Sequence, residues 1–325
     1  MQGKLKDINP QKIKVIFMGT SLFSKEILKA LLDEKYNIIS VFTQPDKKSG
    51  RRNEIEISSV KYFCQKKSLL CFQPQKLDDE VKKKIEKSQP DIIVVAAYGK
   101  ILPENILSIP KFGSINIHTS LLPRYRGPSP IQNTLLNGEK ETGISIMLLD
   151  KGMDTGDILE QKKIEITDSD TVLSLSKKLA RKSVDSILKT IPRWILGKIA
   201  PEKQNDSEAT YCKLIEKNDG RIFWNKSANE VYNQFRAFYP WPGIFSFWHR
   251  NDLQIRIKFN KIGVKKISRK LNYEVGEVFG DKNQISINTA NGVIIVNDLQ
   301  VEGKKSVSAR EFINGYPDFI GSVLR

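Results

Sequence analysis

The sequence is poor in the residues that mark a disulfide-bonded or metal-binding protein. Its 325 residues include two histidines and three cysteines. The cysteines, Cys64, Cys71 and Cys212, are odd in number and show no close paired spacing, so neither a disulfide framework nor a zinc site is encoded. We expect inert thiols in a reducing compartment and no bound metal.

Long apolar runs are missing as well. The most apolar stretch, IIVVAAYG after Asp91, has the length of a strand and is far shorter than a membrane span. The amino-terminal residues MQGKLKDINPQKIK contain no apolar centre like that of a signal peptide. These absences predict a cytoplasmic protein with no membrane partner.

Acidic residues are outnumbered by basic ones. The chain has 53 lysines and arginines against 37 aspartates and glutamates, a formal net charge of +16. Such an excess points to a polyanionic partner, most often nucleic acid and sometimes an anionic membrane surface. The alternative is a lysine-rich composition that serves solubility and has no binding role.

Apolar runs alternate with helical patterns through the first half of the chain. The run at 92–97 has no polar alternation, which is typical of strands that helices cover on both faces of a parallel sheet. The expected strands lie at 14–19, 37–43, 92–97, 114–118 and 143–149. This order predicts a doubly wound α/β domain with a mostly parallel sheet, residues 1–198, whose ligand site lies beyond the carboxyl ends of the strands.

The second half is organised differently. Residues 199–209 are polar and irregular and predict a linker. A helical pattern follows at 228–238, and strand patterns follow at 253–259, 285–290 and 293–300. Short strands with intervening turns predict a small, OB-like β-barrel domain within residues 210–325.

His118 lies at the end of an expected strand, where a sheet exposes side chains to its ligand crevice. Asn116 precedes it by two positions and therefore points to the same side of the sheet. A neutral imidazole can accept a proton, and an Asn amide N–H can hold a developing oxyanion. Asp154, in the loop KGMDTGDI (151–158), can stabilise the charged imidazole and relay a proton through water.

Plainer interpretations of these three residues exist. A histidine at a strand end is often a solvated side chain, Asn116 can bond an adjacent turn, and Asp154 can be a turn former beside glycine. No Ser or Cys lies in a nucleophile-elbow sequence, so nothing indicates a covalent intermediate.

The stretch around these residues resembles the signature of the folate-dependent formyltransferases. The sequence NIHTSLLPRYRGPSPIQ (116–132) is followed by MDTGD (153–157). Further motifs resemble that family in order and spacing, over nearly the whole chain: VFTQPD (41–46), AAYGKILP (96–103), ETGISIM (141–147), ATYCKLI (209–215) and RAFYPWPG (236–243).

The resemblance implies a catalytic set of Asn116, His118 and Asp154. The donor in such an enzyme is 10-formyltetrahydrofolate, and the acceptor in the members most similar to this chain is the α-amine of methionyl initiator tRNA. The amine attacks the formyl carbon directly, through a tetrahedral intermediate that Asn116 and protonated His118 stabilise. The reaction serves the initiation of translation and needs no metal.

The resemblance also implies folate-binding residues. The family's S-L-L-P motif maps onto Ser120, Leu121, Leu122 and Pro123. The leucines offer apolar surface to an aromatic ligand, and the proline fixes the turn.

The tRNA-specific members carry an inserted loop at the position of residues 44–57. The family's arginine after glycine is matched by Arg51, with Arg52 beside it, and a guanidinium can bond a phosphate or a base edge in a fork. Glu54 and Glu56 stand where the family tends to be lysine-rich or apolar.

Basic residues gather in the second half with little acid between them. Such a run is usually a solvated face, but in a small barrel beside a catalytic domain we interpret it as a binding surface for an RNA backbone. Lys258, Lys265 and Lys266 are the expected contacts. The whole run consists of Arg250, Arg256, Lys258, Lys261, Lys265, Lys266, Arg269 and Lys270.

Two alternatives stay open. One is a formyltransferase of the same fold that acts on a small amine, such as glycinamide ribonucleotide or an amino sugar; the basic second half and the 44–57 insertion argue against it. The other is a non-catalytic RNA-binding protein, which explains the charge but not why Asn116, His118 and Asp154 coexist with the S-L-L-P turn. We expect a monomer.

Overall fold

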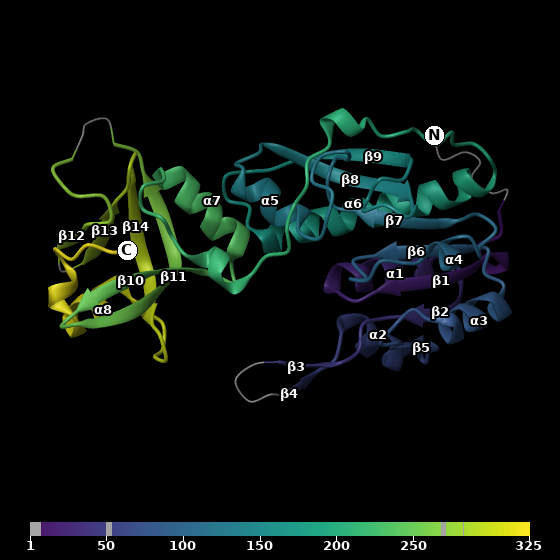
Figure 1. The fold of residues 1–325 in the computed structure, drawn as a ribbon, viewed down its shortest axis with the longest axis horizontal. Helices are drawn as coiled ribbons and strands as arrows, with labels where there is room; N and C mark the ends of the chain where they lie inside the picture. The colour runs from purple at the N-terminus through teal and green to yellow at the C-terminus, as the bar shows by residue number, and fades with distance from the viewer. Residues whose placement is uncertain (1–7, 50–53, 268–270, 282) are drawn as a thin grey trace. The chain divides into compact units, whose positions relative to one another are not determined.

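The computed structural model describes residues 8–49, 54–267, 271–281 and 283–325. Two units are distinguished by their internal packing. The first contains the residues up to 130 together with 141–165 and 176–213, and the second contains 131–140, 166–175 and 214–325. The segment expected to be a linker, 199–209, therefore packs as part of the first unit. Figure 1 shows helices around a sheet in the first unit and a smaller, strand-rich second unit.

A seven-stranded sheet in the order β5-β2-β1-β6-β7-β8-β9 forms the centre of the first unit. The strands are β1 (Lys14–Gly19), β2 (Asn37–Phe42), β5 (Cys71–Phe72), β6 (Ile92–Ala96), β7 (Ser114–His118), β8 (Glu141–Leu148) and β9 (Ile158–Glu165). Neighbours are parallel from β5 to β7, whereas β8 and β9 run antiparallel to their neighbours. The doubly wound, mostly parallel sheet is confirmed. Its strand β7 ends at His118.

Helices follow the strands and cover them. In α1 the side chain of Ser21 accepts a hydrogen bond from the Ser24 N–H and caps the helix, while Ile27, Leu28 and Leu31 are buried against the sheet. The helices of the chain are α1 (Leu22–Asp33), α2 (Ser59–Lys67), α3 (Asp79–Ser88), α4 (Glu104–Leu107), α5 (Pro130–Leu136), α6 (Val172–Ile195), α7 (Ala228–Phe238) and α8 (Ala309–Gly315). None of these described helices is long and apolar enough to cross a membrane.

Within the inserted segment 44–57, two short strands form a β-hairpin. Its strands, β3 (Lys47–Ser49) and β4 (Glu54–Glu56), pair antiparallel, with Glu56 opposite Lys47. At its base the Asp46 carboxylate accepts hydrogen bonds from Lys61 and from the Gln73 amide. The Lys61 ammonium, and then the Gln73 amide, hold the pKa of Asp46 below its ordinary value. Arg51 and Arg52 lie outside the described residues.

The second unit is built on an antiparallel sheet in the order β10-β11-β14-β13-β12, with β15 paired to β14. Its strands are β10 (Ile244–Arg250), β11 (Leu253–Lys265), β12 (Val278–Asp281), β13 (Gln284–Asn288), β14 (Val293–Val301) and β15 (Val307–Ser308). The strand expected at 253–259 continues to Lys265, through a register shift on either side of Lys261.

The last residues of the chain connect the two end strands of this sheet. Phe247 of β10 exchanges both backbone hydrogen bonds with Arg325, at 2.9 and 3.0 Å. On the opposite side, the Gly321 N–H donates to the Val278 carbonyl of β12 at 2.7 Å. Residues 321–325 thus bridge β10 and β12 and satisfy edge groups that would otherwise be unpaired. The small barrel expected from the sequence is confirmed.

Arg236 of α7 explains why residues 166–175 pack with the barrel. Its side chain is 5% exposed and donates hydrogen bonds to the backbone carbonyls of Thr167 and Asp170, at 3.1 and 3.3 Å. A further bond reaches the side-chain oxygen of Asn233 at 2.6 Å. A buried guanidinium must be hydrogen-bonded to be tolerated, so this contact ties the two chain segments together.

Candidate active site

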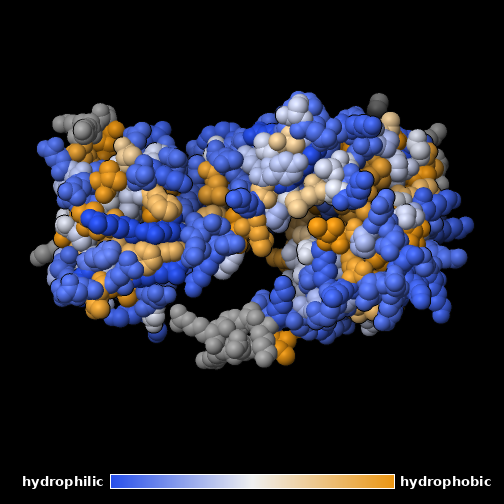
Figure 2. Space-filling model, viewed as in Figure 1, coloured by the Kyte–Doolittle hydropathy of each residue, from blue (hydrophilic) through white to orange (hydrophobic). Residues whose placement is uncertain are grey.

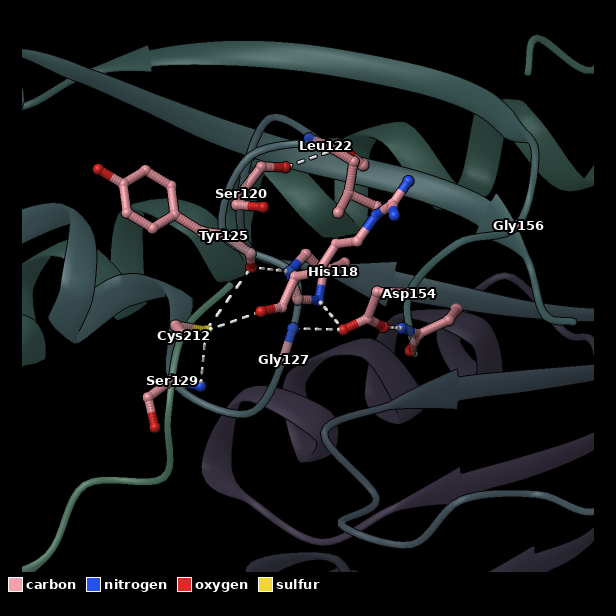
Figure 3. A network of polar contacts seen from close by, with 12 residues as sticks. His118, Ser120, Leu122, Tyr125, Gly127, Ser129, Asp154, Gly156 and Cys212 are labelled. Carbon is pink, nitrogen blue, oxygen red and sulfur yellow. Dashed lines mark hydrogen bonds and ion pairs between the residues drawn. The ribbon is translucent and has the colours of Figure 1, made fainter. Parts of the chain in front are cut away.

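The structure brings Asn116, His118 and Asp154 together at the carboxyl end of β7. The His118 ring atom Nδ1 lies 3.5 Å from Asp154 Oδ2, and the Asn116 amide lies 3.5 Å from Asp154 Oδ1. His118 is 6% exposed. Asn116 and His118 both come from β7. Asp154 comes from the loop between β8 and β9, and its side chain points toward His118 (Figure 3).

The second nitrogen of the imidazole is held by the backbone. His118 Nε2 lies 2.9 Å from the carbonyl oxygen of Tyr125. Because a carbonyl oxygen can only accept a hydrogen bond, Nε2 carries the hydrogen in this contact. The ring atom left to exchange a proton is therefore Nδ1, which faces the Asp154 carboxylate.

Asp154 is held in an uncommon backbone conformation. Its φ is +55°, in the left-handed region that few non-glycine residues adopt. Its Oδ2 accepts a hydrogen bond from the Gly127 N–H at 2.8 Å, so this oxygen lies between the amide of Gly127 and the ring of His118. Gly156, two residues on, has no room for a side chain, because a Cβ there would lie 1.8 Å from the carbonyl oxygen of Leu148.

The S-L-L-P turn is fixed by polar contacts from the neighbouring strands. The Ser120 hydroxyl donates to the Arg124 carbonyl at 2.6 Å, and the Leu122 carbonyl accepts from the Gln161 amide at 2.7 Å. Ser120 and Leu122 are buried, whereas Leu121 and Pro123 are partly exposed. A ligand at this turn meets Leu121, Pro123 and backbone groups, and the Ser120 and Leu122 side chains shape the turn.

The basic run of the second unit divides into engaged and exposed residues. The Arg250 guanidinium forms two hydrogen bonds with Asp318, and Arg256 lies over the Phe245 ring. Lys258 is half-buried, and burial, followed by the charge of Arg256, lowers the pKa of its ammonium. Lys265 and Lys266 are exposed; Arg269 and Lys270 lie outside the described residues. On the face that Figure 2 shows, hydrophilic residues cover much of this unit.

Three residues beside the site, Arg126, Gln204 and Cys212, were not assigned to it from the sequence. Arg126 is 1% exposed, and its guanidinium bonds Gln204, Asp206 and Tyr211 of the segment 199–213. Gln204 in turn bonds the Asp154 loop. The Cys212 sulfur accepts a hydrogen bond from the backbone N–H of Ser129 at 3.4 Å. Burial raises the pKa of the Cys212 thiol. The available signal for Arg126 was its position next to glycine in the polar motif RYRGP.

The arrangement can perform acid–base chemistry without a metal ligand set. Within the described part of the chain, no group of three or more His, Cys, Asp or Glu side chains is placed to hold a metal ion. The imidazole and carboxylate can move a proton, and the Asn116 amide can donate to an oxyanion. A doubly wound sheet with this acid–base site at the end of a central strand is the arrangement of an α/β enzyme.

The comparisons with known proteins narrow this class to one family. Residues 11–191 match the formyl transferase family model, and residues 214–317 match the model of the formyl transferase carboxyl-terminal domain. The chain belongs to the formyl transferase family. A methionyl-tRNA formyltransferase of Caldicellulosiruptor saccharolyticus is 42% identical over 314 residues, which cover 95% of this chain and 99% of that protein.

Of two further matches, the first supports the family and the second concerns the fold. A methionyl-tRNA formyltransferase of Thermodesulfovibrio yellowstonii is 41% identical over 302 residues, covering 93% of this chain and 95% of that protein. Among solved structures, an N-formyltransferase from Helicobacter canadensis in complex with folinic acid and dTDP-3-aminofucose superposes with a TM-score of 0.64. It is 20% identical and covers 87% of this chain and 98% of its own, so this likeness concerns the fold.

Proposed function

We propose that the protein transfers a formyl group from 10-formyltetrahydrofolate to the α-amine of methionyl initiator tRNA. The observation that carries the proposal is the meeting of Asn116, His118 and Asp154 beside the S-L-L-P turn, in a chain that matches methionyl-tRNA formyltransferases over nearly its whole length. The folate donor supplies the formyl carbon that the amine attacks.

In this proposal His118 and Asp154 transfer the proton, and Asn116 stabilises the negative charge that develops. His118 Nδ1 and Asp154 hold the proton that leaves the attacking amine and pass it to N10 of the folate as the bond between N10 and the formyl carbon breaks, so that tetrahydrofolate leaves with this proton. The Asn116 amide stabilises the oxyanion that develops on the formyl group. Its present bond to Asp154 is 3.5 Å long, at the weak limit of a hydrogen bond, so exchanging it for an oxyanion costs little.

The donor is expected at the turn formed by Ser120, Leu121, Leu122 and Pro123. The partial exposure of Leu121 and Pro123 supports an apolar contact with an aromatic ligand. Since Ser120 and Leu122 are buried, the proposal assigns them to shaping the turn around the donor.

The acceptor side of the proposal rests on the second unit and the hairpin. The exposed ammonium groups of Lys265 and Lys266 suit contacts with phosphates, and Lys258 suits a weaker one because it is half-buried. Arg51 and Arg52 are proposed to contact the aminoacyl end of the tRNA. The protein is proposed to act as a cytoplasmic monomer with a catalytic domain, residues 1–198, and a tRNA-binding barrel domain, residues 210–325.

Formyl transfer to charged initiator tRNA, measured beside transfer to a small amine, tests the function. We expect formylation of methionyl initiator tRNA at micromolar concentration and none of an amino sugar nucleotide or glycinamide ribonucleotide under the same conditions. Titration with a folate analogue should saturate. Transfer to the small amine alone would assign a different acceptor, and the absence of both transfer and folate binding would leave only an RNA-binding role.

Lys265 and Arg51 are expected to act differently on the tRNA. Lys265→Ala removes a phosphate contact, so it should weaken initiator and elongator methionyl-tRNA alike and reduce the salt slope of binding by about one unit. Arg51→Ala should instead lower kcat/KM mainly with initiator tRNA, because a misplaced aminoacyl end of about 1 Å can cost about 100-fold in rate.

The two variants serve as controls for each other when assayed on both tRNAs at two salt concentrations. Equal losses on both tRNAs would make Arg51 another phosphate contact and remove the discriminating role proposed for the hairpin.

A further inference from the structure

The segment 199–213 is bound along its length to the two loops that carry the site. On one side, Glu202 exchanges both backbone hydrogen bonds with Ile158, at 2.8 and 2.9 Å, immediately after the Asp154 loop. On the other side, the Arg126 N–H donates to the Thr210 carbonyl and the Arg126 carbonyl accepts from the Cys212 N–H, both at 2.8 Å. The segment therefore joins the loop that holds Asp154 to the turn whose Tyr125 carbonyl holds His118.

Between these two attachments, the side chain of Gln204 uses every hydrogen-bonding position of its amide. The Nε2 group donates to the carbonyl oxygens of Asp154 and Gly156, at 2.9 and 2.7 Å. The Oε1 atom accepts from two nitrogens of Arg126, at 3.1 and 2.9 Å. An amide has two hydrogens to donate and two lone pairs to accept with, so this one is fully occupied.

The contact with Arg126 fixes which way the amide points. A guanidinium only donates hydrogen bonds, and a carbonyl only accepts them. A reversed amide would place its oxygen against two carbonyl oxygens and its NH₂ group against the cation. Arg126 itself is anchored, because it is buried and bonds Asp206 at 2.7 Å and the Tyr211 hydroxyl at 3.3 Å. Although burial opposes it, the Asp206 carboxylate and then Tyr211 raise the pKa of Arg126, so the guanidinium stays charged.

We propose that Gln204, oriented by Arg126, is a positioning residue that holds Asp154 in its left-handed conformation opposite His118. The inference rests on the proposed formyl transfer. Asp154 has a φ of +55°, and a non-glycine residue in this region carries a free-energy cost that the surroundings must offset. Two hydrogen bonds from Gln204, to the carbonyl of Asp154 and to that of Gly156, hold the backbone of this turn, while the Gly127 N–H holds the Asp154 carboxylate.

Gln204→Glu is the decisive variant because it separates the two ends of the amide. A glutamate keeps the oxygen that Arg126 bonds and adds a charge attractive to it, but it has no N–H for the Asp154 and Gly156 carbonyls. Gln204→Ala removes both functions, and Gln204→Met removes both while keeping the side-chain length. Glu202→Gln, an exposed side chain two residues away, is the matched control.

We expect Gln204→Glu, Gln204→Ala and Gln204→Met each to lower kcat on methionyl initiator tRNA about tenfold or more, since small displacements of catalytic groups are costly. KM for the folate donor should change less than about threefold, because the S-L-L-P turn is untouched. In an Asp154→Asn background the Gln204→Ala substitution should cost less than about threefold, since residues that act through one another are not additive. The control Glu202→Gln should match the wild type.

The outcomes separate this inference from the function on which it rests. Full activity of Gln204→Glu would mean that Gln204 only serves as a partner of Arg126. An undiminished loss of activity from Gln204→Ala in the Asp154→Asn background would mean that Gln204 does not act through Asp154. Either result overturns the inference about Gln204 and leaves the proposed function standing. If Asp154→Asn itself is as active as the wild type, the proposed site fails, and the inference fails with it. Thermal unfolding and folate-analogue binding, measured on each variant, identify any loss of activity that comes from misfolding. If Gln204→Glu or Gln204→Ala misfolds, Gln204→Met is tested in its place, alone and in the Asp154→Asn background.

Discussion

Replacing His118 by alanine should lower kcat by about 100-fold or more, the usual scale for losing a general acid–base group. The physical reason is that Nδ1 is the ring atom free to exchange a proton, since Nε2 is held by the Tyr125 carbonyl at 2.9 Å. The second histidine of the chain, His249, belongs to β10 of the second unit. Single-turnover formylation of methionyl initiator tRNA measures the loss.

His118→Gln and folate-analogue binding provide the controls. The glutamine amide reaches the position of the imidazole Nε2 and can still donate to the Tyr125 carbonyl, so it keeps the turn in place while it removes the proton-transfer group. We expect both variants to bind the folate analogue with near-normal affinity and to unfold cooperatively. A value of kcat close to that of the wild type in His118→Ala, with the fold intact, would take this residue out of the mechanism.

Much of the fold could be predicted because local patterns and tertiary packing agree. The strand at 14–19 and the helix at 228–238 begin and end as the sequence indicated, since both carry a continuous apolar run or face bounded by polar capping residues. The strand expected at 253–259 was too short. Its continuation to Lys265 passes through register shifts around Lys261, and a bulge of this kind disrupts the period of two on which the expectation depended.

Other features depend on contacts between distant segments that no local pattern records. The closure of the barrel depends on residues 321–325 meeting β10 and β12, segments separated by more than 40 residues of chain. The hairpin β3–β4 is short and polar, so its strands carry no apolar face to mark them. The residues 166–175 pack with the barrel because the buried Arg236 bonds their carbonyls, and an arginine in a sequence gives no sign of being buried.

The sequence predicted the side chains of the candidate site that perform chemistry, but it did not predict the side chains that hold them in place. Asn116 and His118 share a strand, so the two-residue period alone places them on one side, and the structure puts Asp154 next to both. Gln204 lies in a polar, irregular segment that reads as a linker, and its role follows only from where Arg126 and the Asp154 loop meet in space. A side chain that positions a catalytic residue therefore gives a weaker signal in the sequence than a side chain that performs the chemistry.

Asp154→Asn should lower kcat by about 100-fold, which corresponds to about 2.7 kcal/mol of transition-state stabilisation, while folate affinity changes less than about threefold. The substitution is well suited to the geometry. Asparagine tolerates the left-handed region better than most residues, so the φ of +55° at this position remains accessible, and its side-chain oxygen can still accept from the Gly127 N–H. What it removes is the negative charge 3.5 Å from His118 Nδ1, and with it the carboxylate that holds the transferred proton together with this ring atom.

Asp154→Ala is the informative companion to that variant. Alanine lacks the acceptor for the Gly127 N–H and is disfavoured at a positive φ, so we expect it to lose stability as well as activity, whereas Asp154→Asn should unfold at nearly the wild-type temperature. If Asp154→Asn loses folate affinity in proportion to its activity, Asp154 is a binding residue. If the two variants lose activity equally and both melt early, the carboxylate serves mainly to hold the loop. Only a large fall in kcat with stability and folate affinity preserved assigns the effect to the charge facing His118.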